Sequence, residues 1–196
     1  MSEPSVIVTK DARGVATVAI NRPQVRNAID DNVIHSLTDA FKTLGADGET
    51  RIVVLTGRGV AFSAGADLGW MRRMATGGEA ENFASAKTIS AMLRTLNELP
   101  KPTIARVNGA AYAAAVGLIA ACDIAVAVEE AVFSISEVRI GLVPSTISPY
   151  VLAAIGARAG RRYFLTAEPY SAADACRLGS YTKSFRRPAS TKRSRE

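Results

Sequence analysis

The stretch from Thr103 to Val128 constrains the fold more than any other part of this chain. It reads TIARVNGAAYAAAVGLIAACDIAVAV, with a β-branched run (103–107), a turn at 108–109, a small apolar segment (110–121) and a second β-branched run (124–128). A helix that is apolar on every side lies inside a protein, and crossing a bilayer would need about 20 apolar residues. We therefore predict a short buried helix that begins just after a strand. Its free N–H groups would suit a developing negative oxygen.

Patterns typical of strands and helices alternate along the rest of the chain. We predict strands at 5–9, 15–20, 52–56 and 132–136, and helices at 30–44, 83–99, 146–155, 157–165 and 171–178. This alternation indicates an α/β architecture with parallel strand pairing. The loops 63–68 and 108–114 each follow a strand and precede a helix, and ligands of α/β proteins bind at that edge of the sheet.

The net charge of +6 is concentrated at the C-terminal end. Residues 181–196 hold six basic residues against one acidic residue, so the other 180 residues are nearly neutral. We predict a folded core at 1–179 and a basic, disordered tail at 180–196, and we expect no specific nucleic-acid partner and no membrane partner. No basic and apolar leader is evident, and two cysteines make no disulfide framework, so a cytoplasmic location is expected.

Elimination narrows the available chemistry. The single histidine, His35, lies on a predicted helix among apolar neighbours, and no P-loop, dinucleotide fingerprint or metal-ligand cluster occurs. What remains is a set of backbone N–H donors together with a carboxylate. Glu137 lies between two apolar runs, and burial there would raise its pKa toward the range of a general acid or base. A surface pair with Arg139, or an acidic residue at a helix start, remains an alternative for Glu137.

Four motifs in a fixed order resemble the enoyl-CoA hydratase/isomerase (crotonase) family. They are NRPQVRNAI (21–29), FSAGADL (62–68), VNGAAYAAAVGLIAACDIAVA (107–127) and FSISEVRIGLVP (133–144). The resemblance runs collinearly from about residue 5 to residue 179. The longer stretches at 64–75 and 136–168 look most like the methylglutaconyl-CoA hydratase branch of that family.

The resemblance implies a crotonase-type spiral of ββα repeats that binds an acyl-CoA thioester, without a metal or redox cofactor. It implies that the N–H groups of Ala66 and Ala114 polarise the thioester carbonyl, and that Glu137 occupies one of two catalytic glutamate positions. The residues that it implies for coenzyme A binding are Gln24, Val25, Arg26, Ala28, Ala64, Ala66, Asp67 and Leu68. The expected activity is addition of water to a 2-enoyl-CoA.

The sequence departs from the family pattern in three places. The second glutamate position is Gly117, a usual Gly-Gly-Gly run reads Ala113-Ala114-Ala115, and most of the C-terminal helices that build a trimer are expected to be missing after Gly179. One glutamate suffices for a Δ3/Δ2-enoyl-CoA isomerase, which is therefore the alternative enzyme. A catalytically impaired relic that binds acyl-CoA or RNA is the alternative from another class.

Overall fold

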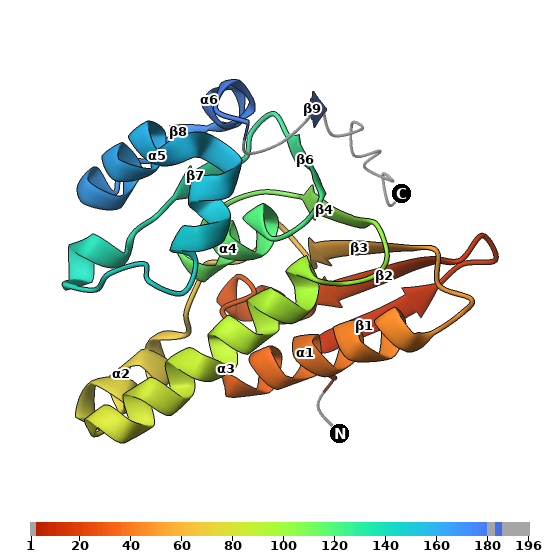
Figure 1. Cartoon of the computed structure of the whole chain (residues 1–196), viewed down its shortest axis with the longest axis horizontal. Helices are drawn as coiled ribbons and strands as arrows, with labels where there is room; N and C mark the ends of the chain where they lie inside the picture. The colour runs from red at the N-terminus through yellow and green to blue at the C-terminus, as the bar shows by residue number, and fades with distance from the viewer. Residues whose placement is uncertain (1–2, 180–182, 186–196) are drawn as a thin grey trace, which may run out of the picture.

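The computed structural model describes residues 3–179 and 183–185, and these residues form two sheets covered by helices (Figure 1). In this part of the chain the larger sheet has six strands in the order β1-β2-β3-β4-β6-β9, and the smaller has the order β5-β7-β8. The large-sheet strands are β1 (Val6–Lys10), β2 (Val15–Ile20), β3 (Ile52–Gly57), β4 (Thr103–Val107), β6 (Ile124–Val128) and β9 (Lys183–Phe185). The small-sheet strands are β5 (Ala111–Tyr112), β7 (Val132–Ser134) and β8 (Tyr170–Ser171).

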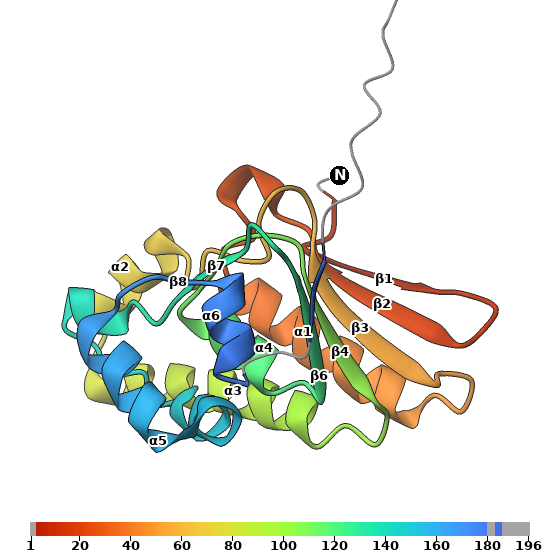
Figure 2. The same ribbon diagram turned by 90° about the horizontal axis from the view of Figure 1, so that it is seen from above.

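Helices lie between most of these strands in the sequence. They are η1 (Pro23–Val25), α1 (Asp31–Ala46), α2 (Leu68–Thr76), α3 (Glu79–Asn97), α4 (Ala114–Ala120), η2 (Glu137–Ile140), α5 (Ser148–Thr166) and α6 (Ala172–Arg177). The helices α1 and α3 lie side by side against one face of the large sheet (Figures 1 and 2). Among the described residues, no helix is long and apolar enough to cross a membrane.

The pairing of the strands confirms the predicted α/β architecture. The pairs β2-β3, β3-β4 and β4-β6 are parallel, whereas β1 and β2 form an antiparallel hairpin. The loops after β3 and β4 therefore leave the sheet at the same edge, because carboxyl ends of parallel strands coincide. That edge holds both loops that the sequence singled out.

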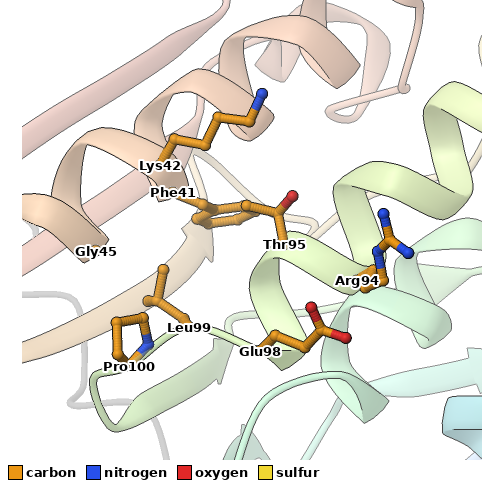
Figure 3. A pocket seen from close by; sticks show the side chains of 8 residues that line it. All are labelled: Phe41, Lys42, Gly45, Arg94, Thr95, Glu98, Leu99 and Pro100. Carbon is orange, nitrogen blue, oxygen red and sulfur yellow. The ribbon is translucent and has the colours of Figure 1, made fainter.

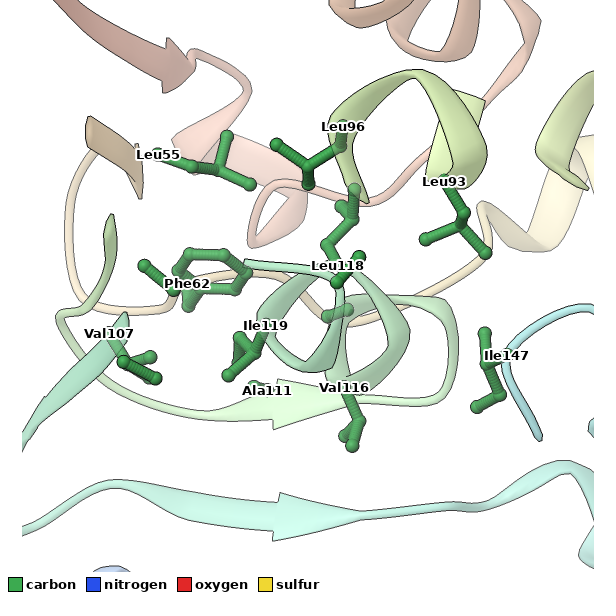
Figure 4. Close-up of a cluster of buried hydrophobic side chains, with 14 of the residues drawn as sticks. Leu55, Phe62, Leu93, Leu96, Val107, Ala111, Val116, Leu118, Ile119 and Ile147 are labelled. Atoms are coloured by element: carbon green, nitrogen blue, oxygen red, sulfur yellow. The ribbon is translucent and has the colours of Figure 1, made fainter. Parts of the chain in front are cut away.

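The predicted buried helix is α4, which lies in the centre of the core (Figure 4). Leu118 is fully buried, and Val116 and Ile119 are nearly so. Residues of the second sheet and of α3 surround it, among them Ala111 and Leu93. The helix begins at Ala114 and not at residue 110, because residues 111 and 112 form a strand beside β7.

Three further expectations are corrected. The break predicted between the helices at 146–155 and 157–165 is confirmed within α5, because Gly156 has a φ of 77°, which is not helical; the first of these helices begins at Ser148 and not at residue 146. The helix predicted at 83–99 is α3, which begins earlier, at Glu79, and ends at Asn97, and Phe83 on it is 67% exposed. We expected no folded structure after Gly179, yet residues 183–185 form β9, parallel to β6. The rest of the predicted tail lies outside the described residues.

Candidate active site

The turn after β3 and the turn after β4 pack directly against each other. The Phe62 N–H donates to the Ala110 carbonyl over 3.0 Å, and the Tyr112 N–H donates to the Ser63 carbonyl over 3.1 Å. A side chain at Gly65 would not fit, because its Cβ would lie 2.7 Å from the Tyr112 carbonyl oxygen. The backbone next to Ala66 is thus held against the backbone next to Ala114, as the proposed pair of N–H donors requires.

Ala66 and Ala114 both have an uncommitted N–H group. Around Ala66, the Ile29 N–H donates to the Gly65 carbonyl and the Asp67 N–H donates to the Ile29 carbonyl, each over 2.8 Å. No hydrogen bond within 3–179 and 183–185 uses the Ala66 N–H. Ala114 is the first residue of α4, so its N–H has no partner inside the helix. Both N–H groups are therefore available to another acceptor.

Ala113 sets the start of α4 through an unusual backbone conformation. Its φ is 52° and its ψ is −120°, a region that glycine adopts easily and other residues rarely. Its N–H donates to the Ser134 carbonyl over 2.9 Å, which ties it to β7. This observation gives physical meaning to the sequence departure at 113–115: the first alanine of the run stands where glycine would be unstrained.

Glu137 begins η2, three residues after the Ser134 carbonyl that holds Ala113. Its Oε2 atom is buried and has no hydrogen-bond partner. Burial raises the pKa of the Glu137 carboxyl above its ordinary value of 4.5. Glu137 is half-buried, and the expected direction of its pKa shift agrees with this burial. Arg139 donates to the Ala167 carbonyl and forms no ion pair with Glu137 in the described part of the chain, whereas the alternative of an acidic residue at a helix start also holds, since Glu137 is in the first turn of η2.

The position that the resemblance assigns to a second glutamate, Gly117, has no room for a side chain. A Cβ atom on Gly117 would lie 2.3 Å from Cγ2 and 2.7 Å from Cβ of Ile147. Ile147 is 1% exposed and lies beside α4 (Figure 4). The absence of a glutamate at 117 could be read from the sequence, but the packing of Ile147 against Gly117 could not.

The two loops predicted to hold coenzyme A lie together. The Ala64 N–H donates to the Arg26 carbonyl over 2.9 Å. Gln24, Val25, Arg26 and Leu68 are exposed, Ala64 and Ala66 are partly exposed, and Ala28 is buried. The structure therefore brings the two loops together, with the exposed members of the set beside the Ala66 turn and Ala28 beneath them. Their role in binding coenzyme A stays a prediction.

Asp67 has a structural task within this predicted set. Its carboxylate accepts hydrogen bonds from the N–H groups of Gly69 and Trp70, which caps α2, and it pairs with Arg22 at 3.2 Å. The Trp70 N–H and the Arg22 charge lower the pKa of Asp67. Arg22 also pairs with Asp30 at 3.0 Å and donates to the Ala28 carbonyl over 2.6 Å. Sequence reasoning missed Arg22, although it stands in the motif at 21–29.

A cavity of about 640 Å³ opens beside the Ala66 turn. It lies between α2, α3 and the segment that follows Glu137, and its walls include Ala66, Ile89, Ile140 and Leu142. Its volume is within the range of small-molecule sites. Ala66 thus connects the pair of backbone donors with a largely apolar space.

A second cavity, of about 340 Å³, lies elsewhere and contains no predicted site residue. It lies between the C-terminal parts of α1 and α3, and Figure 3 shows Lys42, Arg94 and Glu98 at its edge. Within the described part of the chain, no group of three or more histidine, cysteine, aspartate or glutamate residues could hold a metal ion.

Comparison with known proteins agrees with this geometry. A sequence profile described as enoyl-CoA hydratase/isomerase matches residues 10–186, and the chain belongs to that family. A Thermus thermophilus protein with a provisional enoyl-CoA hydratase name is 41% identical over 165 residues, covering 84% of this chain and 65% of its own length. A Pseudomonas fluorescens hydroxycinnamoyl-CoA hydratase-lyase is 32% identical, over 87% of this chain and 63% of its own. This chain therefore spans less than two thirds of either relative.

A solved structure extends the comparison to the fold. The enoyl-CoA hydratase from Shewanella pealeana superposes with a TM-score of 0.91 at 40% identity, over 92% of this chain and 68% of that one. The chain therefore has the crotonase fold. The roles that the family resemblance implies for Glu137, Ala66 and Ala114 remain predictions.

Proposed function

We propose that this chain is an enoyl-CoA hydratase that adds water across the double bond of a 2-enoyl-CoA. The single observation that carries the proposal is that two turns held together by hydrogen bonds each bear an uncommitted N–H group, on Ala66 and on Ala114. In the proposed site these two groups converge on one oxygen, and the buried carboxyl of Glu137 lies within reach of the substrate. Two fixed donors stabilise an enolate oxygen because they need no rearrangement as the charge develops. Substrate enters as a coenzyme A thioester held by the loops around Arg26 and Ala64.

The reaction follows from the positions of these three groups. The thioester oxygen accepts hydrogen bonds from the Ala66 and Ala114 N–H groups, which draws electrons from the double bond and makes C3 electrophilic. Glu137 takes a proton from a water molecule as the water oxygen bonds to C3, and the electron pair moves to the thioester oxygen. Glu137 then returns the proton to C2 as the carbonyl reforms, so the net change is the addition of one water. A raised pKa suits Glu137 to both transfers.

The test is loss of the conjugated thioester absorbance of but-2-enoyl-CoA in the wild type and in a Glu137→Gln variant. We expect the variant to be slower by about 100- to 10,000-fold, the usual contribution of a positioned general acid or base. A Glu130→Gln variant, which changes an exposed carboxylate, is the matched control and should keep the wild-type rate. Equal rates in wild type and Glu137→Gln would refute the role of Glu137.

A Δ3/Δ2-enoyl-CoA isomerase is the second candidate function. Ile147 fills the place beside Gly117, so the site holds one carboxylate where the family pattern has two. One carboxylate can move a proton between C2 and C4 without any water. Incorporation of ¹⁸O from labelled water into the product supports the hydratase, whereas an unlabelled product with a shifted double bond supports the isomerase.

The finer assignments follow from the same proposal. The similarity of 64–75 and 136–168 to the methylglutaconyl-CoA hydratase branch supports a methylglutaconyl-CoA-like substrate, and the cytoplasm is the proposed location. We propose that this chain forms a homo-oligomer through those contacts of the family trimer that it retains. A catalytically impaired acyl-CoA-binding relic is the outcome if thioesters bind but no product forms.

A further inference from the structure

The short helix that carries Glu137 has little burial to hold it in place. None of the four residues of η2 is buried. Its backbone hydrogen bonds are local: the Arg139 N–H donates to the Ser136 carbonyl over 3.1 Å. The Leu142 N–H donates to the Glu137 carbonyl over the same distance. A group that transfers protons needs a fixed position, because a misplacement of about 1 Å can cost about 100-fold in rate, so any contact that anchors η2 bears on the proposed reaction.

Arg139 supplies such a contact. Its guanidinium Nη2 donates to the Ala167 carbonyl over 2.8 Å, across 28 positions in the sequence. Ala167 is the residue at the end of α5, it is completely buried, and its own N–H donates to the Tyr163 carbonyl over 3.0 Å. A hydrogen bond from a charged donor is about twice as strong as one between neutral groups. Arg139 therefore ties an exposed turn to a buried and fixed point.

The same carbonyl also anchors the other half of the proposed site. The Ser134 hydroxyl donates to the Ala167 carbonyl over 3.0 Å, and the Ala113 N–H donates to the Ser134 carbonyl over 2.9 Å. Ala113 directly precedes Ala114, the first residue of α4. A carbonyl oxygen has two lone pairs, and that of Ala167 accepts one donor from each side of the site. This oxygen thus links η2 with the start of α4.

We propose that Arg139 is a positioning residue, which holds Glu137 in register with the Ala114 N–H through the Ala167 carbonyl. The inference rests on the proposed function and deepens it, because it adds a residue that acts on the reaction only through Glu137. Among the described residues, Arg139 forms no ion pair with Glu137, and its guanidinium binds Ala167 instead. The carboxyl therefore stays free to take up and release a proton while its helix is held.

The experiment compares three substitutions. Arg139→Met removes the donors but keeps a long side chain over the same surface, and Arg139→Lys keeps one charged donor. Arg161→Met is the matched control, because Arg161 is an exposed arginine on α5. Hydration of but-2-enoyl-CoA gives kcat and KM for each variant. Calorimetric titration with butanoyl-CoA, which has no double bond to hydrate, measures binding separately.

We expect Arg139→Met to lower kcat by about 10- to 100-fold while butanoyl-CoA binds as it does to the wild type. Arg139→Lys should recover part of the lost kcat, and Arg161→Met should match the wild type. Adding Arg139→Met to Glu137→Gln should not lower the residual rate further, because the carboxyl that Arg139 positions is already gone. Arg139→Gln, which also removes the charge, replaces Arg139→Met in the same comparisons if that variant does not fold.

Two results would overturn the inference in different ways. A wild-type kcat in Arg139→Met, or an equal fold-loss with and without the Glu137 carboxyl, would refute the positioning role and leave the proposed function intact. If Glu137→Gln hydrates but-2-enoyl-CoA as fast as the wild type, the proposed role of Glu137 fails and the role of Arg139 fails with it.

Discussion

Ile147 occupies the space that a side chain at position 117 would need. A Cβ atom on Gly117 would lie 2.3 Å from Cγ2 of Ile147, closer than real Cβ contacts. The absence of a second glutamate is therefore part of the packing of α4 and not an isolated change. In the proposed reaction the site therefore has a single carboxylate, that of Glu137.

This contact predicts a specific coupling between two substitutions. Gly117→Ala should destabilise the fold by about 1–3 kcal/mol, because an added methyl in a packed core forces its neighbours to move. Ile147→Ala should destabilise it by about 2–5 kcal/mol through lost burial. The destabilisation of the double variant should be clearly smaller than the sum of the two single effects, since alanine at 147 makes room for the methyl group added at 117. Urea unfolding measures the stability of all three variants, and strict additivity of the two single effects would contradict the contact between Gly117 and Ile147.

Ala113→Gly should stabilise the protein. A non-glycine residue at φ 52° and ψ −120° stores strain of about 1–3 kcal/mol, whereas the glycine loses about 0.5–1 kcal/mol in chain entropy. We expect a net gain of about 1 kcal/mol in the free energy of unfolding. Ala115→Gly is the control of opposite sign, because Ala115 is buried inside α4 and should lose stability. A loss in both variants would show that position 113 is not strained.

The raised pKa of Glu137 predicts how stability depends on pH. The folded protein holds this proton more tightly than the unfolded chain does. The contribution is therefore fully present below pH 4.5 and is lost as pH rises through the folded-state pKa. Glu137→Gln lacks this loss, so its stability relative to wild type should increase from pH 4.5 upward. Thermal unfolding across that range measures the difference, and a constant difference between the two proteins would contradict burial of the carboxylate.

Arg22 should position the Ala66 turn through Asp67. Arg22→Ala leaves Asp30 and Asp67 without their cation and removes the bond to the Ala28 carbonyl. We expect a loss of about 1–3 kcal/mol in the free energy of unfolding, together with a lower kcat/KM for hydration. Arg22→Lys keeps the positive charge but not the forked geometry of the guanidinium. It should recover part of the lost stability and part of the lost kcat/KM.

Arg73→Ala provides the control for Arg22. Its pair with Asp31 lies at the surface, where the two side chains are 61% and 48% exposed. Exposed pairs contribute little, so we expect a change of less than about 1 kcal/mol and no change in kcat/KM. Equal effects of Arg22→Ala and Arg73→Ala would mean that Arg22 has no special role at the turn.

Much of the fold could be predicted from the sequence because local patterns agree with tertiary packing. The run at 15–20 forms a strand with the predicted bounds, and α1 begins within one residue of the predicted start at 30, with Asp30 as its cap. The start of α4 could not be predicted, because residues 111 and 112 leave the helix to pair with β7, a contact distant in sequence. The strand at 183–185 was missed for the same reason: it exists through pairing with β6 and has no apolar pattern of its own.

The site shows the same division between local and long-range information. The apolar helix predicted free N–H groups at its start, the family resemblance of the motif at 62–68 implied Ala66 as the second donor, and the apolar neighbours of Glu137 predicted its burial. Arg22 and Ile147 could not be recognised, because each acts through a contact to a distant element: Arg22 with Asp67, and Ile147 with Gly117. No residue spacing in the sequence predicts those contacts.

The most direct test of the central claim is the carbonyl stretching frequency of a ¹³C-labelled saturated acyl-CoA bound to this protein. Two N–H donors on one oxygen weaken the carbonyl bond, so infrared difference spectra should show the thioester band at lower frequency than in free solution. The same shift should appear in Glu137→Gln, since that variant keeps both donors. A bound thioester that retains its solution frequency would contradict the convergence of Ala66 and Ala114 on one carbonyl.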